Sequence, residues 1–320
     1  MLRQWLSERD WLLADGATGT SLQAHGLPLG EAPERWTLEQ PDQVRRLHRA
    51  FVDAGADIIL TNSFGGNAVR LGLAGLEGRA GEINSTAARL ARDAVANAGR
   101  RVLVAGSMGP TGEMPAPWGT QDPGAARAMF AAQAQALKAG GVDLLWIETM
   151  SAGPELEAAA AAAASTGLPY VLTASFDTAG RTLAGLEPAA FAAMVRRLPV
   201  PPEAFGANCG VGAADLVLSL RQMPVADQII VAKANCGLPT VNGASVCYAG
   251  TPALMADYAR LAVDAGARIV GGCCGTTPDH LRAMHAALRD HVKGPVPGLE
   301  TITGRLGPLV APPPGLAQAG

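Results

Sequence analysis

The sequence lacks both a large excess of charge and a long apolar run, and each absence excludes a class of protein. Its 320 residues carry a formal net charge of −3 with a pI near 6.0, so we expect neither a nucleic acid nor an anionic membrane as a partner. No charge-free stretch of about 18 strongly apolar residues occurs, so we expect no membrane span. Residues 1–13 include four charged side chains, which is not the pattern of a signal peptide.

Cysteine is also scarce, with five in the whole chain. Without a secretory signal, this number indicates reduced thiols in the cytoplasm. We therefore expect a cytoplasmic protein.

The sequence does contain a regular alternation of short apolar segments with helical ones. The predicted strands are residues 11–14, 57–60, 102–105, 144–147, 170–174, 204–207, 229–232 and 267–270. Such alternation indicates parallel βαβ units, and eight units in roughly 280 residues favour a closed (β/α)8 TIM barrel over an open sheet. We expect the barrel to span residues 1–292, and the Pro- and Gly-rich residues 293–320 to form a loosely structured tail or arm.

Each predicted strand ends in Gly, polar or cysteine residues. In such a barrel these ends lie on one rim, where active sites are built. Side chains that are distant in sequence should therefore converge there, namely Asp15, Glu148, Cys209, Asn235, Cys273 and Cys274. None of the histidines follows a predicted strand, so none is placed to act as a general base.

Two adjacent cysteines, Cys273 and Cys274, follow the last predicted strand between glycines. Adjacent side chains on a strand point to opposite faces, so the pair can act together only where the backbone bends, which glycine permits. With a third cysteine they would offer three soft ligands and one open position, as in a catalytic zinc site. By themselves they could also be buried as small hydrophobic residues or form a strained vicinal disulfide.

Four motifs occur in order: Asp-Gly-Ala-Thr-Gly-Thr at 15–20, Glu-Thr at 148–149, Asn-Cys-Gly at 208–210 and Gly-Gly-Cys-Cys-Gly-Thr at 271–276. With them the chain, over about residues 10–290, resembles the zinc-dependent homocysteine S-methyltransferases. That family includes betaine–homocysteine methyltransferase, S-methylmethionine-dependent enzymes and the homocysteine domain of cobalamin-dependent methionine synthase. The resemblance implies an enzyme that methylates the homocysteine thiol and forms methionine.

The resemblance also implies a zinc site. Its ligands would be Cys209, Cys273 and Cys274, with one Zn²⁺ per chain. In the methionine synthase branch, the position of Asn235 can fill the fourth zinc position before substrate arrives. A thiol that coordinates zinc is deprotonated, so the homocysteine thiol would need no general base.

The tetrapeptide Ala-Asn-Cys-Gly occurs twice, at 207–210 and 234–237. The resemblance assigns zinc to the first copy and leaves Cys236 as a neighbour. Cys247 has no evident partner and is expected to be structural.

For the substrate, the resemblance implies that Asp15 and Glu148 hold the amino group of homocysteine. The carboxylate would suit backbone N–H groups of the turn with Gly16, Ala17 and Thr18, at the start of a helix. Other roles stay open: Asp15 could be a helix N-cap, and Glu148 could pair with a buried arginine.

The methyl donor is the least determined feature. Betaine would need an aromatic cage, and Trp36, Phe64 and Trp118 are the aromatic candidates in rim loops. The tyrosines of the betaine enzyme have no match, and residues 61–64 resemble the methionine synthase branch. We therefore favour methylcobalamin carried on a separate corrinoid protein, with betaine or S-methylmethionine as alternatives. A homo-oligomer is compatible with the sequence.

Two other classes of function remain open. Residues 271–277 could form the phosphate loop of a metal-free barrel isomerase or aldolase. The chain could also be a non-catalytic zinc-binding or scaffold protein. Zinc content tests the first alternative, and methionine formation tests the second.

Overall fold

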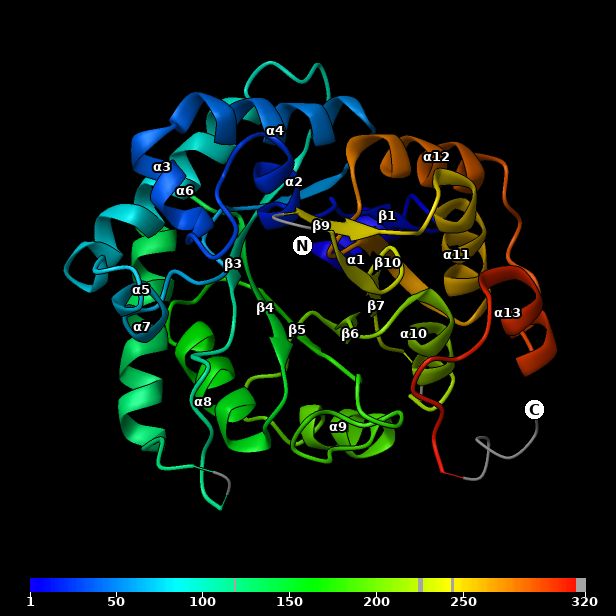
Figure 1. The fold of residues 1–320 in the computed structure, drawn as a ribbon. Helices are drawn as coiled ribbons and strands as arrows, with labels where there is room; N and C mark the ends of the chain where they lie inside the picture. Colours follow the sequence, from blue (N-terminus) through cyan, green and yellow to red (C-terminus); the bar gives the residue numbers. More distant parts are fainter. Residues whose placement is uncertain (118, 224–226, 243–244, 315–320) are drawn as a thin grey trace.

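Eight parallel strands form the centre of the fold (Figure 1). The computed structural model describes residues 1–117, 119–223, 227–242 and 245–314. The barrel strands are β1 (Leu12–Leu13), β2 (Ile58–Leu60), β3 (Leu103–Met108), β4 (Leu144–Met150), β5 (Tyr170–Ala174), β6 (Ala204–Cys209), β7 (Ile230–Ala234) and β10 (Ala267–Gly272). Their order is β1-β10-β7-β6-β5-β4-β3-β2, and a bridge between Ala14 and Ile58 joins the two ends. The predicted (β/α)8 TIM barrel is confirmed.

Helices surround the strands (Figure 1). They are α1 (Leu2–Leu6), α2 (Gly19–Ala24), α3 (Trp36–Glu39), α4 (Pro41–Asp53), α5 (Ala68–Gly72), α6 (Ala80–Val95), α7 (Pro123–Ala139), α8 (Gly153–Ala164), α9 (Pro188–Val195), α10 (Ala213–Leu220), α11 (Pro252–Asp264), α12 (Pro278–Arg289) and α13 (Leu299–Leu306), with 3-10 turns η1 (Pro33–Arg35) and η2 (Glu77–Arg79). Each parallel strand is followed by at least one helix on the outside, as right-handed crossovers require.

Helix α1 closes the amino-terminal end of the barrel. Its residues Leu2, Trp5 and Leu6 pack in one buried cluster with the side chains that point into the barrel, among them Trp146 of β4. Apolar burial of this kind stabilises by about 25 cal/mol per Å². Because this end is plugged, the carboxyl ends of the strands are left as the open end.

An antiparallel hairpin, β8 (Pro239–Asn242) and β9 (Ser245–Tyr248), lies between β7 and α11. The sequence analysis did not predict it. After the hairpin, the Gly250 N–H donates to the carbonyl of Cys236 at 3.0 Å, and the Cys236 N–H donates to the carbonyl of Cys274 at 2.9 Å. The hairpin is thereby tied to the last strand end.

The carboxyl-terminal segment differs from the expected loose tail. Residues 299–306 form α13, whose Ile302 and Leu306 are buried against α10 and α11. The i, i+4 spacing of these two residues gives the helix one apolar stripe. Beyond it, the Asp215 carboxylate accepts hydrogen bonds from the N–H groups of Val310 and Ala311, at 3.0 and 2.9 Å. The segment is therefore anchored to the barrel as far as residue 311.

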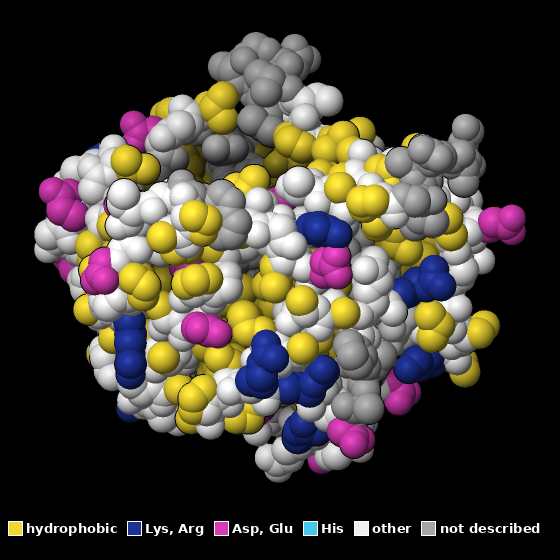
Figure 2. All heavy atoms as spheres, turned by 90° about the horizontal axis from the view of Figure 1, so that it is seen from below, with side chains coloured by type: hydrophobic (Ala, Val, Ile, Leu, Met, Phe, Trp, Pro, Cys, Tyr) yellow, Lys and Arg dark blue, Asp and Glu magenta, His cyan; other side chains and the backbone are white. Residues whose placement is uncertain are grey.

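The face of the molecule in Figure 2 carries basic and acidic side chains interspersed among hydrophobic and neutral ones. Within the described ranges, no helix combines the length and apolar character needed to cross a membrane.

Candidate active site

Three cysteines meet at the open end of the barrel. Cys209 is the last residue of β6, and Cys273 and Cys274 directly follow β10. Their sulfur atoms lie within 4.8 Å of one another, and none of the three forms a disulfide. Thiolates around one zinc ion, with bonds of about 2.3 Å, lie about 3.8 Å apart. Three sulfurs at the observed spacing therefore fit a metal ion with small movements.

The backbone directs these side chains into the cluster. Cys209 has a φ of 63° and Gly210 one of 73°, and a non-glycine residue in this region costs about 1–3 kcal/mol. This left-handed turn ends β6 and carries the chain away from the strand. At Gly272, a Cβ would lie 2.2 Å from the Cγ2 of Thr276, so the tight turn before the cysteine pair requires glycine.

The three thiols do not become thiolates unaided. The hydrogen bond with Cys209, together with burial, raises the pKa of the Cys273 thiol well above its usual value. Three negative sulfurs at this spacing repel one another, so a cation is needed to hold them deprotonated. This chemistry also fits a zinc site.

Asn235 supports the cluster from the end of β7. Its Nδ2 donates to the Gly210 carbonyl at 2.6 Å and lies 3.4 Å from the Cys209 sulfur. Its Oδ1 accepts a hydrogen bond from the Cys274 N–H at 2.9 Å. These bonds hold the two turns that carry Cys209 and Cys274. Because an amide oxygen has two lone pairs, the role of Asn235 as a displaceable fourth zinc ligand stays a prediction.

Tyr248 of the β8–β9 hairpin also approaches the cluster. Its ring lies against Gly275, where a Cβ would come within 2.3 Å of the Tyr248 Cγ. Its hydroxyl also opposes the rise in the pKa of the Cys274 thiol that Cys273 and burial cause. Sequence reasoning missed this residue, because a hairpin after the seventh strand is not part of the regular βαβ pattern.

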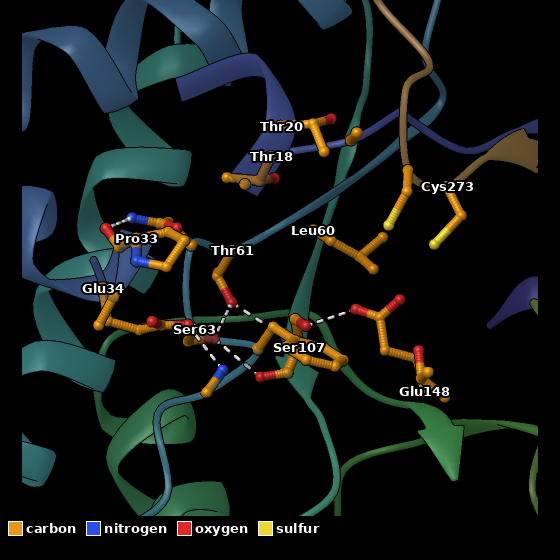
Figure 3. Close-up of a pocket in the computed structure, with 18 of the residues that line it drawn as sticks. Thr18, Thr20, Pro33, Glu34, Leu60, Thr61, Ser63, Ser107, Glu148 and Cys273 are labelled. Carbon is orange, nitrogen blue, oxygen red and sulfur yellow. Dashed lines mark hydrogen bonds between the residues drawn. The ribbon is translucent and has the colours of Figure 1, made fainter. Parts of the chain in front are cut away.

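A cavity of about 480 Å³ lies beside the cysteines. All three of them line it, together with Glu148, Lys233 and the turn that begins at Gly16. Figure 3 shows Cys273 on one side of this space and the Glu148 carboxylate facing it from below. The cavity therefore places three thiols that fit a metal ion and one carboxylate within reach of the same small molecule.

Glu148, the predicted substrate carboxylate, lies at the end of β4. Its Oε1 accepts a hydrogen bond from the Ser107 hydroxyl at 2.5 Å (Figure 3). Burial raises the pKa of Glu148, while the charge of Lys233 and the bond from Ser107 oppose the rise. The alternative of a pairing with a buried arginine is not observed among the described residues, since no arginine forms an ion pair with Glu148 there.

Asp15, the second predicted carboxylate, is already engaged by the protein. It is fully buried, and its Oδ1 forms an ion pair with Lys233 Nζ at 2.8 Å. Its Oδ2 accepts a hydrogen bond from the Leu60 N–H at 2.7 Å. Asp15 is not among the residues that line the cavity. Its side chain does not cap α2, because that helix begins at Gly19 with Thr18 as its N-cap.

The turn after β1 lines the cavity with Gly16, Ala17 and Thr18, as expected. A Cβ at Gly16 would lie 2.4 Å from the Thr276 carbonyl oxygen, so only glycine fits there. The Ala17 N–H donates to this same Thr276 carbonyl at 3.0 Å. Ala17 therefore borders the cavity, but its N–H is already used, unlike the expectation of a free donor for a carboxylate.

Among the described residues, the aromatic candidates for a donor site do not form a cage. Trp36 packs against the main hydrophobic core and does not line the cavity. Phe64 does line it, with the guanidinium of Arg70 5.8 Å from its ring centroid. Trp118 lies outside the described residues. Phe64 is thus the one aromatic side chain among the described lining residues.

Sequence reasoning also missed Lys233 and Ser107. Lys233 is the one charged residue in the apolar strand β7, and Ser107 is the one hydroxyl in β3. A polar group in a strand buried on both faces is costly unless it is paired. The sequence alone therefore indicates that each of these two residues has a polar partner. What the sequence does not show is which partner each one meets.

Comparisons with known proteins point to one enzyme family. The family model for homocysteine S-methyltransferase matches residues 12–288. The methionine synthases of Mycobacterium leprae and Mycobacterium tuberculosis are both 31% identical to the chain, over 303 and 294 residues. These alignments cover 89% and 87% of this chain but 25% and 24% of the relatives, so the chain spans about a quarter of their length.

Among solved structures, the homocysteine methyltransferase MmuM from Escherichia coli is similar over its whole length. Its metallated form superimposes with a TM-score of 0.74 at 27% identity, covering 89% of this chain and 99% of that one. Its apo form gives a TM-score of 0.71.

Proposed function

The chain belongs to the homocysteine S-methyltransferase family of enzymes, and we propose that it transfers a methyl group to the thiol of homocysteine and forms methionine in a zinc-dependent reaction. The observation that carries this proposal is the cluster of Cys209, Cys273 and Cys274 in the same cavity as Glu148. Family membership leaves a metal-free isomerase or aldolase, or a non-catalytic zinc protein, without support.

The three cysteines would hold one Zn²⁺, and the open fourth position would accept the substrate sulfur. Zinc bound there supplies charge that keeps a thiol ligand deprotonated at neutral pH, when the free group has a pKa near 8.5. The residues of this chain supply position: Asn235 fixes the turns that carry Cys209 and Cys274. A site with three thiolates would keep a negative charge, which would favour attack by the substrate sulfur on the methyl carbon of the donor. The bond between that carbon and the donor would break, and its electron pair would stay on the donor.

For the donor, we propose methylcobalamin carried on a separate corrinoid protein. Two observations support it: the described lining residues contain a single aromatic ring, that of Phe64, and the relatives include methionine synthases. Betaine or S-methylmethionine is the alternative, because Glu34 and Phe64 also line the cavity and suit a small cation. We also propose a cytoplasmic location, where five free cysteines remain reduced.

A donor panel with zinc-loaded protein and homocysteine tests both levels of the proposal. The donors are betaine, S-methylmethionine, free methylcobalamin and methylcobalamin on a corrinoid protein. We expect methionine with the carried cofactor. Robust methionine formation from betaine alone would overturn the choice of donor, and no methionine from any donor would count against the activity itself.

A further inference from the structure

A β-bulge lies where β4 reaches the cavity. Between the pairs formed by Ile147 and by Met150, β4 contains one residue more than its neighbour β5. Such a bulge interrupts the alternation of side chains between the two faces of a strand. As a result, the consecutive residues Glu148 and Thr149 both line the cavity, while Met150 returns to the main hydrophobic core. The bulge therefore shapes one wall of the cavity.

Within the bulge, Thr149 adopts a backbone conformation that is uncommon for threonine. Its φ is 62°, in the left-handed region, and for a β-branched residue this is an outlier. A residue in this region costs free energy, so it persists only where its surroundings hold it. Glycine, in contrast, adopts positive and negative φ about equally readily. Thr149 therefore depends on bonds from other residues to keep this conformation.

Asn208 of β6 supplies such bonds. Its Oδ1 accepts a hydrogen bond from the Thr149 N–H at 2.7 Å, and its Nδ2 donates to the Thr149 hydroxyl at 2.7 Å. The Thr173 hydroxyl, in β5, donates to the same Oδ1 at 2.7 Å. Asn208 is buried, and its bonds reach from β6 past β5 to β4. They hold both the backbone and the side chain of Thr149.

Asn235, in the second Ala-Asn-Cys-Gly copy, holds different turns. Its amide bonds to the Gly210 carbonyl and to the Cys274 N–H, at 2.6 and 2.9 Å, and so supports the candidate metal ligands. Asn208 contacts the sulfur cluster through one longer bond, 3.8 Å from its Nδ2 to the Cys273 sulfur. The short bonds of Asn208 thus serve the bulge in the cavity wall.

We propose that Asn208 is a positioning residue that keeps Thr149 in its left-handed conformation, and with it the cavity wall that receives homocysteine. The inference rests on the proposed function and adds a residue to it. Without Asn208, Thr149 would relax to a negative φ in most molecules. The apparent affinity for homocysteine would then fall in proportion to the fraction of molecules that keep the bulge.

The test is a double-mutant cycle that combines Asn208→Ala with Thr149→Gly. Isothermal titration calorimetry at saturating zinc gives the dissociation constant of homocysteine for the unmodified protein, both single variants and the double variant. Zinc content and thermal unfolding are the controls. Thr149→Gly by itself measures what the Thr149 side chain contributes, so the effect of Asn208→Ala is compared between matched backgrounds.

In the chain that retains Thr149, Asn208→Ala should weaken homocysteine binding by about five- to a hundredfold, the range that corresponds to holding a non-glycine residue at positive φ. In the Thr149→Gly background, the same substitution should weaken binding by less than about threefold, because glycine reaches positive φ without help. An equal loss in both backgrounds would overturn the proposal.

Zinc affinity distinguishes this role from a direct role at the metal. Competition with a zinc chelator should show that Asn208→Ala loses less affinity for zinc than for homocysteine, since its contact with the cluster is the long bond to Cys273. A loss of zinc affinity at least as large as that of homocysteine affinity would assign Asn208 to the metal site and overturn the proposal.

If Asn208→Ala does not fold, Thr173→Val takes its place, because valine has the shape of threonine without the hydroxyl that bonds to Asn208. The loss of homocysteine affinity should then be about two- to tenfold, the range of one hydrogen bond, and should again require Thr149. The same loss in the Thr149→Gly background would overturn the proposal. Failure of the unmodified zinc-loaded protein to bind homocysteine would instead overturn the proposed function.

Discussion

The two copies of Ala-Asn-Cys-Gly, at 207–210 and 234–237, have one sequence and two surroundings. Cys209 is half-buried and belongs to the sulfur cluster. Cys236 is fully buried and stands outside the cluster, and burial raises the pKa of its thiol to about 11. The identical tetrapeptide therefore supplies a candidate metal ligand in one strand and a core residue in the next.

Strand register explains the difference. In the pairing of β6 with β7, Cys209 lies beside Ala234, so the second copy begins where the first reaches its third residue. In the first copy, Cys209 itself adopts a positive φ of 63°; in the second, the positive φ of 89° falls on Gly237. The role of the cysteine in this motif thus depends on its position relative to the end of its strand at the barrel rim.

The most direct test of the difference between Cys209 and Cys236 is to remove each cysteine in turn. Cys209→Ala should reduce zinc from about one equivalent to near zero and abolish methyl transfer, since two thiolates do not complete the site. Cys236→Ala should retain zinc. Metal analysis of both purified variants checks this, and full zinc in Cys209→Ala would shift the ligand role toward Cys236.

The rates at which the cysteines react with a thiol reagent should distinguish the same residues without mutation. In zinc-loaded protein, we expect the exposed Cys247 to react with a thiol reagent first. The three cluster thiols should react only after a chelator is added. Cys236 should react more than about a hundredfold more slowly than Cys247, because it is buried and its pKa is high. Peptide mapping of the labelled protein identifies each site. Early labelling of Cys236 would show that the second Ala-Asn-Cys-Gly copy is accessible to solvent and would contradict its role as a core residue.

The asparagines of the two copies offer a smaller effect. Asn235→Ala removes the bonds to the Gly210 carbonyl and the Cys274 N–H, and we expect zinc affinity to fall about ten- to a hundredfold. Asn208→Ala is the comparison variant. The short bonds of Asn208 go to Thr149 and Thr173, and its contact with the cluster is a longer bond of 3.8 Å from Nδ2 to the Cys273 sulfur, so we expect a smaller loss than in Asn235→Ala. Competition with a zinc chelator measures both, and an equal loss in the two variants would contradict the distinction.

The smallest expected effect is on stability. Cys236→Ala should lower the free energy of unfolding by about 1–2 kcal/mol, because it leaves a small void in a packed core. Urea unfolding of the zinc-loaded variant measures it. An unchanged free energy of unfolding would mean that the surrounding strands close the void.

Much of the fold was predictable because periodicity is a local signal. The strand ends that carry Cys209 and Cys273 followed from the alternation of apolar segments with helices, and their meeting followed from barrel closure. The partners of Asp15 were not predictable, since Lys233 is 218 residues away in the sequence and the strand pattern gives no side-chain contact. Likewise, Tyr248 reaches Cys274 through a hairpin outside the repeating unit, and α13 arises in a segment whose Pro and Gly content indicated a loose tail.

The closing seam of the barrel has a dynamic consequence. Strand β1 has two residues. In the described part of the chain, two backbone bonds join its segment to that of β2, from the Asp57 N–H to Leu13 and from the Asp15 N–H to Ile58, at 2.7 and 3.0 Å. Two side-chain bonds reinforce them, from the Leu60 N–H to Asp15 and from the Leu13 N–H to Asp57, at 2.7 and 3.0 Å. Local opening begins where few ladder bonds must break together. Backbone amides at this seam should therefore exchange with deuterium sooner than those of β4 or β6. A ligand that contacts the turn at Gly16 should slow this exchange. Hydrogen–deuterium exchange at the seam would then report whether the cavity is occupied.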